Sequence, residues 1–315
     1  MGESRGLEFS LAPFVLLSLR RANAAASAVA FLVLAVVLAP VSAVVFATAT
    51  VAGDTSRQGE TQTRLEAEYA VTLAGIPIGR GNWIIELSDN QYTAAASGTT
   101  TGIVGFFTDG RGSVAARGTI SAGQPVPTSY GATLSYNHKI DEVRISLNGG
   151  NVTEYDAEPP VPPMPDRIPV TAADRRGVTD PMTSMLNRVT GKGDPISSEA
   201  CNRKVAVFDG RLRYDLYSEF KYMDNVKANR GYEGPAVVCA VHFTPIAGYV
   251  PDRPVIRYLV TLRDAKVWLA PIEGTRVVVP FRFSMPTPLG TGLLEATEFV
   301  TVAQPSQSRR PAKTQ

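Results

Sequence analysis

Residues that bind metals or carry redox chemistry are scarce in this chain, whose 315 residues include two cysteines and two histidines. Neither His138 nor His242 has a second histidine, a cysteine or a carboxylate at the spacing of a zinc site. Cys201 and Cys239 are too far apart for the C-x-x-C motif of a redox pair. The sequence therefore predicts neither a metal ion nor an organic cofactor.

Catalytic motifs are also absent, since the chain has no G-x-S-x-G elbow, P-loop or H-E-x-x-H. An envelope hydrolase that acts on a glycan or an ester through Asp180, Asp209 and Asp215 is the alternative to a non-enzymatic protein. It needs two carboxylates facing each other at a defined separation. Asp180 is predicted to cap a helix and Asp209 to form a turn, so we expect no enzyme activity.

The formal net charge of +2 comes from the two ends of the chain, and the middle is slightly negative. The middle has no cluster of Lys and Arg, so it lacks the electrostatic footprint of a nucleic-acid-binding protein. The tail, residues 304–315, is rich in Ser, Gln, Pro and Arg and is predicted to be disordered.

One long uncharged run occurs, and it lies near the N-terminus. A positively charged start, an apolar stretch, Pro40 and small residues form the three-part pattern of a secretory signal peptide over residues 1–49. Cleavage is expected near Ala43 or Ala49. The run is also long enough to span a bilayer, so an uncleaved anchor is the alternative and would be the one membrane contact. Both interpretations place the protein in the periplasm.

Residues 64–303 read as a single β-rich domain, because apolar and polar residues alternate and turn residues recur about every ten positions. Hairpin turns are predicted at Asp89-Asn90, Gly149-Gly150 and Asp209-Gly210. About a dozen strands result, among them "AVVCAVHF", "VIRYLVTL" and "KVWLAP". Sheets of this size must curl or close to hide their edges. We expect a large curved or incompletely closed antiparallel β-barrel or β-spiral.

Two segments interrupt the alternation. Six prolines between Pro159 and Val170 make residues 158–177 a stiff strap over the sheet. A linker between two domains is the alternative. Residues 180–190 are predicted to form the one short helix, with Asp180 as its cap and an apolar face that packs on the strands.

A binding groove is expected between this helix and the sheet, because curved sheets whose side chains do not fill the interior often hold an apolar ligand. Methionines adapt to varied ligands, although filling the core is their commoner role. The candidate groove residues are Met182, Met185, Leu186, Trp268, Phe106 and Phe107.

The predicted export of the chain decides how its two cysteines are interpreted. In an oxidising envelope, two cysteines in one domain are expected to form a structural disulfide, Cys201–Cys239. His242 lies three residues from Cys239, which on a strand places the two on opposite faces and argues against a catalytic thiol.

Residues from about Leu65 to Val302 resemble an uncharacterised envelope family, domain of unknown function 3108. The resemblance rests on "YAVTLAGIPIGRGNWIIEL", "TTGIVGFFTDGRGSVAARG", "TDPMTSMLNRV", "VAVFDGRLRYDLY", "PIAGY" and "KVWLAP". More distantly, the pattern is similar to β-spiral envelope-integrity proteins and to lipoprotein carriers. The resemblance implies a periplasmic, non-enzymatic binding or structural role. We expect a protein that supports cell-envelope integrity by binding a lipid or acyl chain, a lipoprotein or a partner peptide in the groove. A purely structural scaffold with protein partners is an alternative.

Overall fold

The computed structural model describes residues 62–102 and 110–304. The leader, the candidates Phe106 and Phe107, and residues 305–315 of the tail lie outside the described residues. The strands are β1 (Gln62–Leu73), β2 (Ile76–Leu87), β3 (Gln91–Thr100), β4 (Arg111–Ser121), β5 (Gln124–Tyr136), β6 (Lys139–Asn148), β7 (Asn151–Glu158), β8 (Asn187–Arg188), β9 (Arg203–Phe208), β10 (Arg213–Lys227), β11 (Arg230–Gly231), β12 (Glu233–Ala247), β13 (Lys266–Pro271), β14 (Val277–Thr287) and β15 (Gly290–Gln304). The helices are α3 (Pro181–Ser184) and α4 (Pro254–Thr261), with 3-10 turns η1 (Ala173–Arg175) and η2 (Ser198–Cys201).

Each strand follows the alternation in its sequence. In β1 the side chains of Leu65, Ala67, Tyr69 and Val71 are buried, and most of the residues between them are at least partly exposed. The three predicted hairpins are confirmed, because β2–β3, β6–β7 and β9–β10 are joined at the predicted turns. Local turn chemistry therefore sets the register of these strand pairs.

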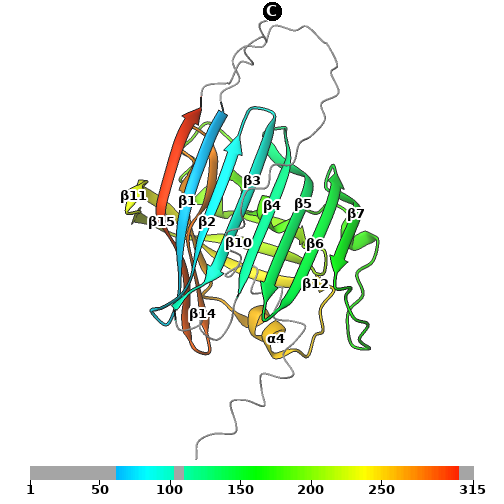
Figure 1. Cartoon of the computed structure of the whole chain (residues 1–315). Coiled ribbons are helices and arrows are strands. Elements are labelled where there is room, and N and C mark those ends of the chain that lie inside the picture. Colours follow the sequence, from blue (N-terminus) through cyan, green and yellow to red (C-terminus); the bar gives the residue numbers. More distant parts are fainter. Residues whose placement is uncertain (1–61, 103–109, 305–315) are drawn as a thin grey trace, which may run out of the picture.

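One sheet contains strands from both halves of the chain. Its order is β7-β6-β5-β4-β3-β2-β1-β15-β14-β13-β12-β10-β9, and its central junction is the antiparallel pair β1–β15. In Figure 1 the strands β1 to β7 lie side by side in one layer, and β10 and β12 cross behind them. The two outermost strands of this order, β7 and β9, are not paired with each other. The predicted curved, incompletely closed antiparallel sheet is confirmed.

The chain between β7 and β9 fills the gap between these edges. The Val178 amide donates to the Gly150 carbonyl in the β6–β7 turn, and Thr179 forms a parallel bridge with Val207 of β9. The rings of Tyr155 in β7 and Phe208 in β9 are 5.5 Å apart. These contacts give the exposed edges of the sheet hydrogen-bonding and apolar partners.

The Pro-rich segment has no strand, as the lack of proline N–H groups requires. It is tied to the other half of the chain, because the Ile168 amide donates to the Tyr249 carbonyl and the Gly248 amide donates to the Ile168 carbonyl. Residues 159–172 therefore run across the molecule as one wall of the cavity described below.

Strand β12 buries both faces over part of its length. Ala236 and Val238 of β12 belong to the main core, which also contains the inward residues of β1 to β6. The alternate residues Val237 and Cys239 belong to a second cluster, which includes Val267, Phe283, Val189, Ile196, Ala200 and Cys201. Near-continuous apolar sequence in β12 to β14 reflects burial on both faces.

The helix predicted over residues 180–190 is too long. Helix α3 ends at Ser184, and residues 187–188 form the short strand β8 against β14. Met182 and Leu186 are nonetheless buried. A single helical turn followed by an extended segment brings both side chains to the sheet, as a longer helix would. Asn187 also favours the extended path, since its side-chain amide donates to the Ala200 carbonyl at 2.7 Å.

A second helix occurs where the sequence predicted a strand. The segment "VIRYLVTL" belongs to α4, which begins at Pro254 and ends at Thr261. Its β-branched residues favour a strand. Two features favour the helix instead: Pro254 stands at the first helical position, and Ile256 and Leu259, three residues apart, are both buried on one helical face.

Candidate functional site

Three cavities adjoin one another, two of them beside α4 (Pro254–Thr261), and each is named here by its lining. The arginine cavity, of about 550 Å³, is lined by Lys139, Asp141, Arg167, Arg211, Arg253 and the Pro-rich segment. The helix cavity, of about 60 Å³, lies between α4 and strands β10, β12 and β14. The inner cavity, of about 120 Å³, lies between the α3 segment and strands β9 to β15.

Shared wall residues show that the three cavities adjoin one another. Leu212 and Ile256 line both the arginine cavity and the helix cavity. Leu216, Val241 and Phe283 line both the helix cavity and the inner cavity. A row of adjoining cavities therefore extends from a charged opening, past α4, to a region lined by aliphatic and aromatic side chains. We call the helix cavity and the inner cavity together the apolar channel.

The alternation of residues along the strands places the side chains that line the channel on one face of the sheet. Leu216 of β10 is paired with Phe243 of β12, and Val267 of β13 is paired with Phe283 of β14, so all four share one face. Helix α4 covers part of this face with Ile256 and its neighbours Leu259 and Leu262. The amphipathic helix and the strand face together make a lining with few polar atoms.

One of the predicted groove residues lines the apolar channel. Met185, the residue after α3, lies in the wall of the inner cavity. Met182 and Leu186 are 1% and 0% exposed and belong to the main core, so their assignment to an open groove is wrong. The tight packing of the α3 turn on the sheet explains this, because α3 lies against β4, β5 and β9.

Trp268 is also a core residue and not a groove residue. Its side chain is 7% exposed, and its indole Nε1 donates to Asp224 Oδ2 at 2.8 Å. The Arg282 guanidinium lies 5.2 Å from the ring centre. Packing, a hydrogen bond and a cation–π contact therefore satisfy this side chain within the protein.

Three guanidinium groups converge on the arginine cavity from separate parts of the chain. Arg167 comes from the Pro-rich segment, Arg211 from the β9–β10 turn and Arg253 from the residue before α4. Burial lowers the pKa of the Arg167 guanidinium, and the charges of Arg253 and Arg211 lower it further. No run of basic residues in the sequence signals this cluster, because its members are dispersed.

Backbone carbonyls hold two of these arginines. Arg167 Nη1 donates to the Gly248 carbonyl at 2.6 Å. Arg211 Nη1 donates to the Pro159 carbonyl at 2.9 Å, and its Nη2 lies 3.7 Å from Asp141 Oδ1. The Pro159 carbonyl is available to Arg211 because the extended proline segment pairs with no strand.

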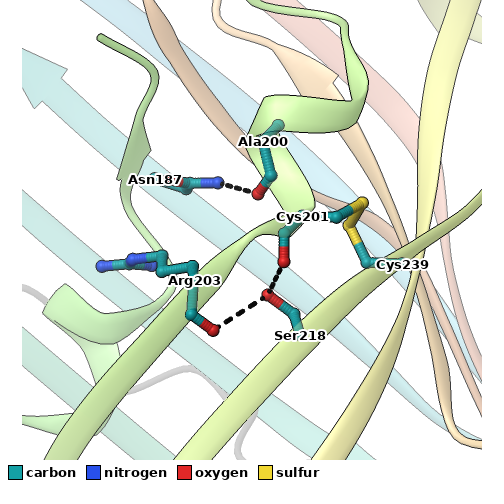
Figure 2. Close-up of a disulfide and its surroundings, with 6 residues drawn as sticks. All are labelled: Asn187, Ala200, Cys201, Arg203, Ser218 and Cys239. Atoms are coloured by element: carbon teal, nitrogen blue, oxygen red, sulfur yellow. Dashed lines mark hydrogen bonds between the residues drawn. A yellow bond between two sulfur atoms is a disulfide. The ribbon is translucent and has the colours of Figure 1, made fainter.

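The disulfide predicted between Cys201 and Cys239 is present, with a Cα–Cα distance of 5.3 Å. Figure 2 shows that polar contacts surround it. Asn187 donates to the Ala200 carbonyl, and Ser218 Oγ donates to the Cys201 carbonyl at 2.6 Å. The bridge therefore fixes η2 on β12, at the end of the segment that forms one wall of the inner cavity.

Arg203 is a further fixing residue and was not singled out from the sequence. Its Nη1 donates to the Ser184 carbonyl at 2.6 Å, at the end of α3. Burial lowers the pKa of the guanidinium to about 10. Among the described residues, no carboxylate forms an ion pair with it. Arg203 thus places one positive charge in the wall of the inner cavity.

The carboxylates of the hydrolase alternative have structural partners. Asp180 caps α3, accepting from the Thr183 amide at 2.8 Å, and is completely buried. Asp209 accepts from the amides of Arg211 and Leu212 in its turn. Asp215 pairs with Arg213 and Lys204. The predicted cap at Asp180 and turn at Asp209 are confirmed.

Burial raises the pKa of the Asp180 carboxyl from 3.8 to about 6, although hydrogen bonds from Thr183 oppose the shift. The folded protein therefore holds this proton more tightly than the unfolded chain does. The resulting stabilisation is complete below pH 3.8 and is lost as the pH rises through about 6. Protonation of Asp180 therefore contributes about 2 kcal/mol more to the free energy of unfolding at pH 4 than at pH 7.

An Asp180→Asn variant keeps a capping oxygen but does not titrate. We expect its free energy of unfolding to rise by about 2 kcal/mol less than that of the wild type between pH 7 and pH 4. Urea unfolding at four pH values measures this difference. Identical pH profiles for the two proteins would contradict the assignment.

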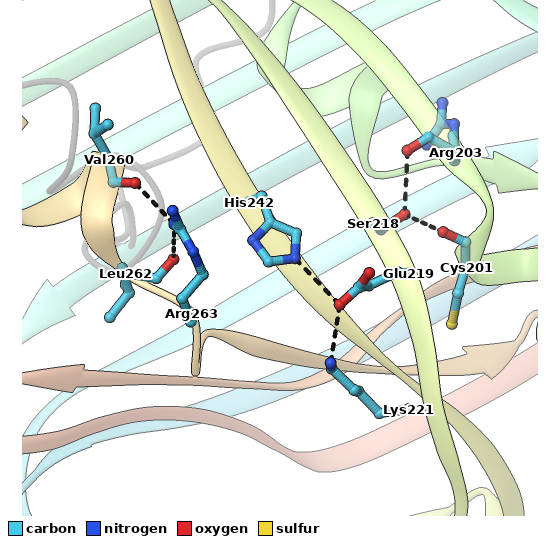
Figure 3. A network of polar contacts seen from close by, with 9 residues as sticks. All are labelled: Cys201, Arg203, Ser218, Glu219, Lys221, His242, Val260, Leu262 and Arg263. Carbon is cyan, nitrogen blue, oxygen red and sulfur yellow. Dashed lines mark hydrogen bonds and ion pairs between the residues drawn. The ribbon is translucent and has the colours of Figure 1, made fainter.

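His242 belongs to a surface network on the face opposite Val241. Figure 3 shows its ring beside Glu219, which also contacts Lys221. The His242 Nε2–Glu219 Oε1 distance is 3.5 Å, and the imidazole stacks on Tyr217. Within residues 62–102 and 110–304, no group of three or more His, Cys, Asp or Glu side chains has the arrangement of a metal site.

Comparison with known proteins gives family membership and a distant structural likeness. No curated protein matches the chain. A crystal structure of a beta-barrel-like protein of domain of unknown function DUF1849 from Brucella abortus has 9% identity and a TM-score of 0.41, with 76% of this chain and 97% of that chain covered. In the described part of the chain, no helix has both the length and the apolarity to cross a membrane. The model of the family "Protein of unknown function (DUF3108)" matches residues 68–297, and the chain therefore belongs to this family.

Proposed function

We propose that this protein is an exported, non-enzymatic binding protein of the periplasm that holds the apolar chain of an amphiphile and thereby supports the cell envelope. The observation that carries the proposal is the apolar channel, whose two cavities adjoin at shared wall residues. Leu216, Val241 and Phe283 form its neck.

The shape of the channel favours a chain over a compact ligand. Its two parts, of about 60 and 120 Å³, are each small compared with the roughly 300–1,000 Å³ of a pocket for a drug-sized molecule. A narrow, elongated space lined by Leu, Val, Ile and Phe matches a flexible hydrocarbon, because each methylene gains about 0.8 kcal/mol on leaving water.

Helix α4 is the element that can admit such a chain. It has eight residues, and the side chain of its N-cap residue, Arg253, makes no capping hydrogen bond. A short helix without a side-chain cap opens more readily than the strands beneath it. Outward movement of Ile256 and Leu259 would widen the helix cavity at its boundary with the arginine cavity.

Two features support the periplasmic assignment. Residues 1–49 have the composition of an export signal, and a disulfide persists in an oxidising compartment. The named carboxylates have capping, turn or ion-pair partners, and this favours binding over hydrolysis.

The test fills the neck of the channel. A Val241→Phe variant adds volume where the two cavities meet, and Val260→Phe adds the same volume at a residue of α4 that is 40% exposed. We expect Val241→Phe to weaken binding of a fluorescent C12 fatty acid at least tenfold and Val260→Phe to leave it unchanged. Fluorescence titration gives the dissociation constants, and thermal unfolding shows that both variants fold.

Two results would contradict the proposal. If the wild-type protein, purified from the periplasm, binds no acyl probe and carries no lipid in native mass spectrometry, the channel is not a chain-binding site. Equal binding by the wild type and Val241→Phe would place the acyl chain elsewhere on the protein. In the first case, a scaffold with protein partners becomes the better interpretation.

A further inference from the structure

We infer that the arginine cavity binds the phosphate head group of the amphiphile whose chain occupies the apolar channel, with Arg167 and Arg253 as its principal ligands. This inference rests on the proposed function. It adds the charge and the chemical class of the ligand, which the apolar channel alone leaves undefined.

Cations exceed carboxylates in the lining of the cavity. Lys139 and the three arginines face two acids, Asp141 and Glu158. Arg211 lies near Asp141, but Arg167 and Arg253 have no carboxylate at ion-pair distance among the described residues. Two guanidinium charges therefore remain without a protein counter-ion, in a space of about 550 Å³.

Arg167 also has hydrogen-bonding capacity that the described part of the chain leaves unused. Its Nε is buried and has no hydrogen-bond partner among these residues. A buried N–H without an acceptor costs about 1–3 kcal/mol, and more when the group is charged. An anion in the cavity offers an oxygen acceptor to the Nη2 of the same guanidinium, whose acceptor is otherwise the Met164 sulfur, and charge-assisted hydrogen bonds are the stronger kind.

The two guanidinium groups that have no carboxylate partner in the described part of the chain both contact one side chain. Arg167 Nη2 lies 3.5 Å from Met164 Sδ, and Arg253 Nη2 lies 3.2 Å from the same sulfur. A thioether is a weak acceptor, whereas a phosphate oxygen is a strong one. Met164 is 37% exposed, so its flexible side chain can leave and a phosphate can take its position between the two arginines.

Position connects this head group to a hydrocarbon chain. Leu212 and Ile256 line both the arginine cavity and the helix cavity, so an anion beside Arg253 lies at the entrance to the channel. The positive end of the α4 dipole lies at the same entrance, since Arg253 is its N-cap residue. Planar guanidinium groups bind phosphate in a bidentate manner, which distinguishes this site from one for a neutral glyceride head.

The experiment compares two ligands with the same chain, lysophosphatidic acid and monoacylglycerol, and includes inorganic phosphate alone. Isothermal titration calorimetry is applied to the wild type, to Arg167→Gln/Arg253→Gln, and to Arg176→Gln/Arg257→Gln. The last variant loses the same charge at two exposed residues outside the cavity lining. Thermal unfolding confirms that each variant is folded.

In the wild type we expect lysophosphatidic acid to bind at least tenfold more tightly than monoacylglycerol. This preference disappears in Arg167→Gln/Arg253→Gln and persists in Arg176→Gln/Arg257→Gln, and monoacylglycerol binds equally to all three proteins. Weak competition by inorganic phosphate that requires Arg167 and Arg253 supports the same site.

Each contrary outcome has a distinct meaning. Equal affinity of the wild type for both lipids overturns the head-group inference and leaves chain binding intact. Inorganic phosphate that binds as tightly as lysophosphatidic acid overturns the link between cavity and channel and assigns the arginines to free phosphate. If neither lipid binds, the proposed function fails and the inference fails with it.

Discussion

Replacing Cys201 and Cys239 by serine lowers the free energy of unfolding by about 4 kcal/mol. The disulfide closes a loop with a sequence separation of 38 residues, and in the chain-entropy model a loop of this length restricts the unfolded chain by that amount. Urea unfolding of the oxidised wild type and of the double serine variant gives the two free energies. Thiol titration of the unfolded, non-reduced wild type should find no free cysteine.

The same change should weaken ligand binding through the inner cavity. The bridge anchors η2 to β12, and residues 184–203 between α3 and β9 line that cavity with Met185, Asn187 and Ala200. Without the bridge this segment retains the hydrogen bonds of Asn187 and Ser218 but loses its covalent attachment. We expect affinity for the acyl probe to fall in the double serine variant and in the reduced wild type.

Ser218→Ala is the control for this experiment. It removes the hydrogen bond from Ser218 Oγ to the Cys201 carbonyl and leaves the disulfide in place. One hydrogen bond contributes about 1 kcal/mol, so this variant should be much less destabilised than the double serine variant. Two free thiols in the wild type, or a double serine variant as stable as the wild type, would contradict the structural role of the bridge.

Features set by neighbouring residues were predictable from the sequence. The hairpin at Gly149-Gly150 needs positive φ at both residues, which glycine adopts without strain, and the structure has φ of 55° and 78° there. The Asp180 cap and the alternation in β1 are similarly local, since each depends on side chains a few positions apart. The disulfide followed from the predicted export of the chain and from the absence of other cysteines.

Features set by distant residues were not predictable in the same way. Residues 185–190 carry helical spacing, but pairing of β8 with β14 ends the helix early, and β14 begins at Val277, far along the chain. The arginine cavity draws Arg167, Arg211 and Arg253 together through the path of the Pro-rich segment. No window of the sequence contains all three, so their convergence depends on tertiary structure.

The methionines show how similar residues in one segment acquire different roles. Met182→Ala should destabilise the protein by about 2–5 kcal/mol, because Met182 is 1% exposed in the main core and its removal leaves a cavity there. Met185→Ala should destabilise it less, since Met185 is partly buried at the wall of an existing cavity. Urea unfolding of the two variants measures the contrast.

Ligand binding should show the opposite order. Met185→Ala changes the wall of the inner cavity and should alter the affinity for the acyl probe. Met182→Ala removes atoms outside the channel, so the probe affinity should not change at temperatures where this variant is folded. A variant pair with equal stabilities would contradict the core assignment of Met182. Probe affinity that responds to Met182 and not to Met185 would instead restore the groove first predicted from the helical spacing, with α3 as its wall.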